Sequence, residues 1–220
     1  MGIVIESRKA NREYGNHAAQ ADDFATDAAG HLLPHEGESF ETMPLGSVEL
    51  TAYLAVGKAY RQNPYTFEGM RWEIGFSPSR VCFYSPDTNT ILGGVAERAD
   101  IATMGFYYYT ELRSLSLGNV SEPGGAYVSL LFHIWATAKV SMQIGVRVYG
   151  EPAQLHVFAT LFIARLVEGY AALGPGLGFD SGEAERLFTI VNGFNYESGA
   201  QTDLFLVAEE NRLRLLVNLP

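Results

Sequence analysis

The sequence contains little charge and very little lysine. Only 18% of its 220 residues are charged, against about 25% in a typical globular domain, and its three lysines are Lys9, Lys58 and Lys139. Apolar residues make up 47% of the chain. A domain of this size buries roughly 70% of the surface that its unfolded chain exposes. The composition therefore indicates apolar surface that another molecule covers, most simply further copies of the same chain.

Cysteine and basic residues are also scarce. Cys82 is the only cysteine, which excludes an internal disulfide, and its position between Val81 and Phe83 predicts a buried, unreactive thiol. The net charge of −10 opposes binding to nucleic acid, because an acidic surface repels a polyanion. We therefore expect no direct contact with nucleic acid.

The chain lacks a long uncharged apolar run. Its two most apolar stretches, residues 126–149 and 153–173, each contain charged side chains, among them Lys139 and Arg165. A membrane span needs about 18 or more consecutive apolar residues, and residues 1–5 are too short for the apolar part of a signal peptide. We expect a soluble protein without a membrane span or signal peptide, either cytoplasmic or associated with a particle.

Residues 1–46 differ in composition from the rest of the chain. They hold eight acidic residues against three basic ones, and Tyr14 and Phe24 are two of their three aromatics. Alanines and Tyr14 recur at helical spacing over residues 10–28, but so weakly apolar a helix is not stable alone. We predict an acidic N-terminal arm that lies on a neighbouring surface and contributes to assembly more than to folding, followed by one body over residues 47–220.

The start of the body is compatible with two structures. Val48, Leu50 and the following apolar residues alternate as in a strand, whereas the alanines of residues 47–61 also fall on one helical face. The alanines favour a helix there, and Asn63–Pro64 predicts the turn that follows it.

The middle of the chain predicts antiparallel strands separated by turns. Proline, serine, aspartate and asparagine punctuate this region and favour tight turns between apolar runs. The predicted strands are Arg71–Phe76, Arg80–Tyr84, Thr90–Ala96, Tyr127–Trp135 and Val140–Tyr149, with one or two further strands over Phe106–Leu117.

Helical periodicity appears late. Pro152 is suited to the first position of a helix, and apolar residues then recur at helical spacing until Gly174. A second helix is predicted over residues 182–192, and a hairpin over residues 203–219. The fold class predicted is α+β: an antiparallel twisted sheet with two or three helices, mostly late in the chain. An all-β sandwich or jelly roll with inserted helices is the alternative.

The run from Phe106 to Tyr109 is the most unusual local feature. In a strand, alternate residues face opposite sides, so both faces of this segment need a cover. It fits a central core strand, a strand at an interface between copies, or a stacking platform for a sugar or base. The candidate interface residues are Phe106, Tyr107, Tyr108, Tyr109, Tyr14 and Phe24.

Other residues that could take part in catalysis or ligand binding lack the sequence neighbours that such sites require. The glycines of residues 174–178 follow a predicted helix, whereas a phosphate-binding loop follows a strand. Pro34 lies between His31 and His35 and argues against a helical metal-binding pair. His133 and His156 have apolar neighbours, as core or interface histidines do. We predict no catalytic residue, no cofactor and no metal site.

Two classes of function remain open from the sequence. The first is a non-enzymatic structural or assembly protein that acts through self-association as a homo-oligomer, such as a component of a virus or phage particle or of another multi-subunit array. The second is a small enzyme or ligand-binding domain whose internal pocket is lined by the tyrosine cluster, His133 and Trp135. The sequence does not specify a small-molecule ligand.

Overall fold

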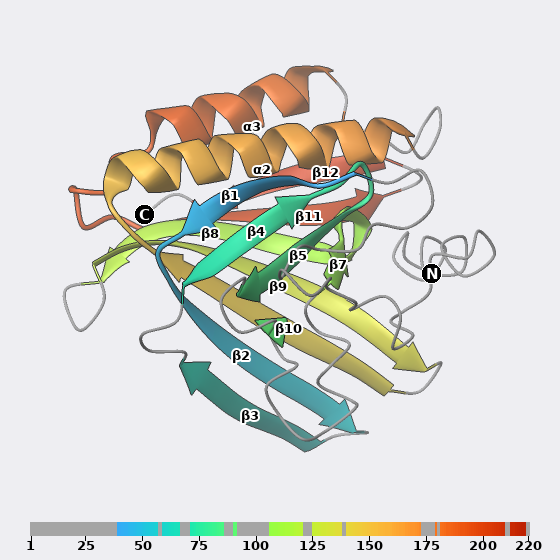
Figure 1. The fold of residues 1–220 in the computed structure, drawn as a ribbon. Coiled ribbons are helices and arrows are strands. Elements are labelled where there is room, and N and C mark those ends of the chain that lie inside the picture. The colour runs from blue at the N-terminus through green and yellow to red at the C-terminus, as the bar shows by residue number, and fades with distance from the viewer. Residues whose placement is uncertain are drawn as a thin grey trace.

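The computed structural model of the chain is an α+β fold with two antiparallel sheets and two helices late in the sequence, which confirms the predicted fold class (Figure 1). In some strands, such as the one over residues 59–66, only the backbone is described. The structure describes residues 39–56, 59–66, 71–85, 90–91, 106–120, 125–137, 140–172, 179, 181–209 and 212–218.

The smaller sheet has the order β1-β4-β5-β6, with β7 also paired to β5. Its strands are β1 (Glu41–Leu45), β4 (Trp72–Phe76), β5 (Arg80–Ser85), β6 (Thr90–Ile91) and β7 (Phe106–Tyr108). The turn between β4 and β5 is held by Ser77, whose Oγ accepts hydrogen bonds from the backbone N–H groups of Ser79 (3.3 Å) and Arg80 (3.2 Å). This hairpin was predicted from its apolar runs and its Ser-Pro-Ser turn, and the structure confirms it.

The larger sheet has the order β12-β11-β8-β9-β10-β2-β3. Its strands are β2 (Ser47–Val56), β3 (Ala59–Thr66), β8 (Leu112–Val120), β9 (Gly125–Thr137), β10 (Val140–Tyr149), β11 (Thr202–Glu209) and β12 (Arg212–Asn218). The predicted pairing of β9 with β10 and the predicted C-terminal hairpin of β11 and β12 are both present.

The helix predicted over residues 47–61 is wrong. These residues form β2 and the start of β3, and β2 pairs with β10 on one side and β3 on the other. Val48 and Leu50 are buried between the sheets while Glu49 is half-buried on the opposite face. The alternating pattern was the correct signal, because two neighbouring strands supply the hydrogen bonds that outweigh the helical preference of alanine.

The predicted turn at Asn63–Pro64 is also wrong. Both residues lie within β3, where Pro64 stands opposite Thr51 of β2. In the described part of the larger sheet, β3 is an end strand. Proline is tolerated in such a strand because its missing N–H need not pair with a further neighbour.

The last residues of the predicted arm belong to the smaller sheet. Residues 41–45 form β1, which pairs along its length with β4. This backbone pairing moves the start of the body toward the N-terminus, from residue 47 to residue 41. Residues 1–38, with the helical stripe and the aromatics Tyr14 and Phe24, lie outside the described residues.

Two helices complete the fold. The first is α2 (Pro152–Ala172), which begins at the predicted proline, and the second is α3 (Ser181–Gly193). Six predicted inward positions of α2 are buried: Leu155, Phe158, Ala159, Phe162, Leu166 and Tyr170. By length and composition α2 could cross a membrane, a test that a core helix of a globular fold also passes, and eight of its residues are buried in this core.

Aromatic side chains join α2 and the two sheets into one core. Phe162 of α2 meets Phe76 of β4 and Tyr109 at ring-centroid distances of 6.4 and 6.2 Å. Tyr107 of β7 stacks on Phe132 of β9 at 4.4 Å, which bridges the smaller sheet to the larger one. The face of the larger sheet that packs on this core is called the inner face below, and the opposite one the outer face.

Candidate functional site

The aromatic run leaves the strand after Tyr108. Tyr109, Thr110 and Glu111 form the short 3-10 helix η3 (Tyr109–Glu111), and the backbone N–H of Tyr108 donates to Glu111 Oε2 at 3.1 Å. Tyr107, Tyr108 and Tyr109 are at most 4% exposed. Their rings are therefore covered by this chain itself, as the core alternative expects, and a contact between copies has to rest on other side chains. Only the backbone of Phe106 is described.

A buried polar cluster lies next to this run. Glu111 is 0% exposed, and it is close enough to influence the pKa of Tyr107, of Arg113 on β8 and of Tyr170 on α2. Burial lowers the pKa of Arg113, while the nearby Tyr170 hydroxyl and Glu111 carboxylate act in the opposite direction. A buried charge is tolerated only when it is paired and hydrogen-bonded. Glu111 of η3, Arg113 of β8 and Tyr170 of α2 therefore lie close to one another.

Three buried tyrosines make the fold sensitive to alkali. Burial raises the pKa of Tyr107, Tyr170 and Tyr196 above the ordinary tyrosine value, whereas in the unfolded chain each titrates near pH 10. A raised pKa in the folded state means that stability is complete below about pH 10 and declines as the pH rises further.

We expect these three tyrosines to ionise only when the chain unfolds. A titration that records tyrosinate absorbance and circular dichroism together should show part of the absorbance change coinciding with loss of the folded signal. Reversible ionisation of all 12 tyrosines near pH 10, without any change in circular dichroism, would contradict this expectation.

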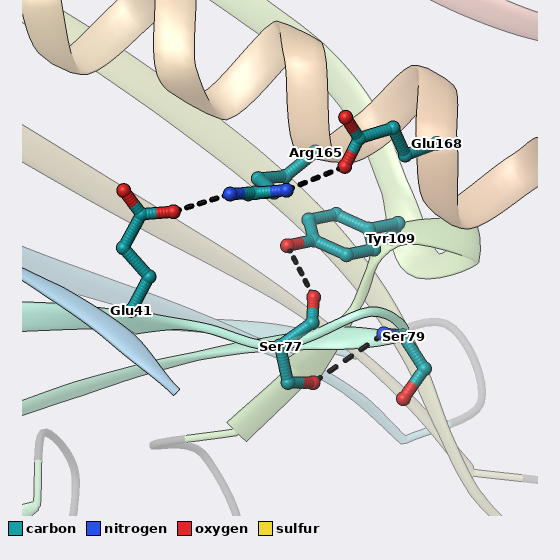
Figure 2. Close-up of polar contacts among 6 residues, drawn as sticks. All are labelled: Glu41, Ser77, Ser79, Tyr109, Arg165 and Glu168. Carbon is teal, nitrogen blue, oxygen red and sulfur yellow. Dashed lines mark hydrogen bonds and ion pairs between the residues drawn. The ribbon is translucent and has the colours of Figure 1, made fainter. Parts of the chain in front are cut away.

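Figure 2 shows how α2 is anchored above the smaller sheet. Arg165 of α2 pairs with Glu41 of β1 and, at 2.6 Å, with Glu168 one turn further along the helix. Beneath them, the hydroxyl of Tyr109 donates to the backbone carbonyl of Ser77 at 3.0 Å. The three side chains of these ion pairs, Arg165, Glu41 and Glu168, are each about one-third or more exposed. The pairs therefore orient α2 on β1 and contribute little to stability.

The pocket predicted from the tyrosine cluster and His133 is not formed by these residues together. Phe132 points to the inner face, where it stacks on Tyr107. His133 is the next residue of β9 and so faces the opposite side of the sheet. Within the described part of the chain, Tyr107 and His133 therefore lie on opposite faces of the larger sheet. The side chain of Trp135 is outside the described residues.

The other described residues that the sequence analysis considered for chemistry, Cys82 and His156, make packing contacts. Cys82 is fully buried in β5, as predicted. His156 of α2 meets the ring of Tyr196 edge-on at 5.0 Å. Among the described residues, no three histidine, cysteine, aspartate or glutamate side chains converge as a metal site. His31, His35 and residues 174–178 lie outside the described residues.

The outer face of the larger sheet carries a polar and aromatic cluster that the sequence analysis missed. Arg147 of β10 lies over the ring of Tyr127 of β9, with 4.7 Å between the guanidinium carbon and the ring centroid. It also donates to Tyr149 Oη at 3.3 Å, and that hydroxyl donates to Glu49 Oε2 at 3.2 Å. The alternation of arginine and tyrosine in β10 was the available signal, but only the strand pairing brings Glu49 and Tyr127 beside it.

Beside Arg147, the outer face carries mostly small, uncharged residues as far as Asp203 and Phe205 of β11. We call this area the outer patch. Phe205 of β11 is its most prominent member and is 43% exposed, while its neighbours Leu204 and Leu206 are buried on the inner face. The outer patch consists of Asp203, Phe205, Ser114, Ser116, Ser129, Leu131, Gly145 and Arg147.

Comparison of the sequence with protein-family models and with curated proteins finds no match. Among solved structures, the chain is similar to the Vps36 N-terminal PH domain with 15% identity and a TM-score of 0.36. The similarity covers 64% of this chain and 88% of the other. At this TM-score it carries no argument about function.

Proposed function

We propose that this protein is a non-enzymatic structural subunit that acts through self-association. The observation that carries the proposal is the outer patch, a sheet surface with small residues at its centre and the exposed ring of Phe205. The described helices and the smaller sheet all pack on the inner face of the larger sheet. An exposed aromatic ring beside small uncharged side chains, with charged residues at the edge, is typical of contacts between protein molecules.

The outer side of α2 supports the same proposal. Val157 is 60% exposed, and Ala153, Ala171 and Ala172 are exposed on the same helix. Exposed apolar side chains on a helix often mark a surface that contacts another molecule. Together with the low charge content of the chain, this favours a subunit of a larger assembly, located in the cytoplasm or on a particle.

We expect the purified protein to form a defined oligomer rather than a 24.1 kDa monomer. Mass photometry at nanomolar concentration and light scattering at micromolar concentration measure this directly. A stable protomer contact should bury more than about 1,000 Å² in total, which keeps the oligomer intact on dilution. A folded species that remains monomeric at both concentrations would show the proposal to be wrong.

A further inference from the structure

We infer that two copies of this chain associate through their outer patches, related by a two-fold axis that runs parallel to the strands between β8 and β9. This inference rests on the proposed function, because it names the surface and the partner by which self-association occurs. The argument comes from the strand register, from the charges at either side of the patch and from the shape of its surface.

The register places the outer patch in two rows across four strands. Pairing sets Asp203 opposite Ser116, Ser116 opposite Ser129, and Ser129 opposite Arg147. The second row follows the same strands: Phe205, Ser114, Leu131 and Gly145. Each row therefore runs from β11 through β8 and β9 to β10, with unlike residues at its two ends.

The two-fold axis lies between the two stacked sheets, above the line midway between β8 and β9. It sets each end of a row opposite the other end of the same row in the partner subunit. Adjacent strands are about 4.8 Å apart, so β11 and β10 lie about 7 Å to either side of this axis, measured across the strands of the sheet. When a second copy is stacked on the first, β11 of each copy faces β10 of the other. Aligned sheets stack about 10 Å apart, within reach of side chains from both faces.

The first row is complementary in charge under this symmetry. Asp203 of one copy faces Arg147 of the partner subunit, and the same pair recurs on the other side of the axis. Within one copy, Asp203 forms no ion pair with the residues that the structure describes, and its Oδ1 accepts a hydrogen bond from Gln201 at 2.9 Å. Arg147 contacts Tyr127 and Tyr149 within its own copy and keeps these contacts in the dimer. Two symmetric pairs of opposite charge would fix the register of the contact.

The second row is complementary in shape. Phe205, the exposed ring of the patch, faces Gly145 of the partner subunit, which has no side chain. Gly145 does not need to be glycine for the fold of its own chain, because an added Cβ would meet Thr51 at ordinary contact distances of 3.7 and 3.8 Å. A ring from the partner subunit can therefore lie over Gly145 without meeting a side chain of that residue. Nearer the axis, Ser114 faces Leu131 of the partner subunit, and neither side chain is charged.

Charge reversal tests the first row. Asp203→Arg and Arg147→Asp each place like charges opposite each other, and we expect each to weaken association by at least about tenfold. The double variant restores opposite charges and should recover most of the affinity. Glu185→Arg makes the same change of charge on the exposed side of α3 and should have no effect. Sedimentation velocity over a concentration series gives the dissociation constants, and circular dichroism confirms that each variant is folded.

Gly145→Val tests the second row without touching a charge. A Cβ at this position makes only ordinary contacts within the single copy, and valine favours strands more than glycine does. The added side chain lies where Phe205 of the partner subunit would pack, so we expect a melting temperature that is not lowered in the dissociated protein and association at least about tenfold weaker. If the wild-type protein forms an oligomer that neither Gly145→Val nor the charge reversals weaken, this interface is wrong while the proposed function stands. A wild-type protein that is monomeric throughout would overturn both.

Discussion

Replacing Phe162 with alanine should lower the free energy of unfolding by about 3–5 kcal/mol. Phe162 is fully buried, and its ring contacts Phe76, Tyr109 and Phe158, which come from the smaller sheet, from η3 and from α2 itself. Removing the ring leaves a cavity where three elements meet, and they cannot collapse into it independently. For a chain of this length the melting temperature should fall by about 10 °C.

Val157→Ala is the matched control for this prediction. It shortens an apolar side chain on the same helix, but Val157 is 60% exposed in the single chain, so the stability of the dissociated protein should change by no more than about 0.5 kcal/mol. Thermal or urea unfolding monitored by circular dichroism measures both variants. Equal stability of the Phe162→Ala and Val157→Ala proteins would mean that α2 does not pack on the sheets as described.

Replacing Gly46 with alanine should destabilise the fold by about 3 kcal/mol or more. Gly46 connects β1 of the smaller sheet to β2 of the larger one. A Cβ at this position would lie 1.8 Å from the backbone carbonyl oxygen of Tyr149 and 3.2 Å from Gly150 Cα. Because both are backbone atoms, the chain can relieve the clash only by moving the crossing between the sheets.

Gly193→Ala serves as the control for Gly46→Ala. Gly193 ends α3, and an added Cβ there meets nothing within 4 Å. Alanine is a better helix former than glycine by about 1 kcal/mol in a helix interior, so this variant should be as stable as the wild type or slightly more stable. Comparable melting temperatures for the two variants would contradict the close approach at Gly46.

Elements with a strong local pattern were predictable from the sequence. The helical spacing after Pro152 identified α2 and its buried face, and Ser77 to Ser79 identified the turn between β4 and β5. In both cases the signal lies within a few residues. Hydrogen bonds along a helix and around a tight turn are formed by neighbours in the sequence, so the pattern is sufficient to predict them.

Residues 47–66 show where local patterns were insufficient. Alanine favours a helix and Pro64 favours a turn, yet both segments are strands. β10, about 90 residues later in the sequence, provides the partner that makes β2 extended. The strand identity of this segment therefore depends on a neighbour that its own residues do not specify.

The candidate site was even less accessible to sequence reasoning. The aromatic run at Phe106–Tyr109 drew attention because of its composition, but its three tyrosines are covered within the chain. Phe205 lies in a run of apolar residues in which nothing distinguishes it from Leu204 or Leu206 before the sheet faces are known. Composition reveals how much apolar surface there is, whereas strand register decides which residues present it.

Composition and local periodicity were enough to predict the fold class and the late helices, and they show how little charge the chain carries. These properties depend on composition and on periodicity over a few residues, which the chain carries whatever its tertiary structure. The pairing of β11 with β8 and of β8 with β9, in contrast, is known only from the folded structure. Those pairings join residues that are distant in sequence, and they set Asp203 and Arg147 at the two ends of one row and Phe205 and Gly145 at the ends of the next. Complementarity between surfaces arises from this register, because shifting a strand by one residue moves all of its side chains to the other face.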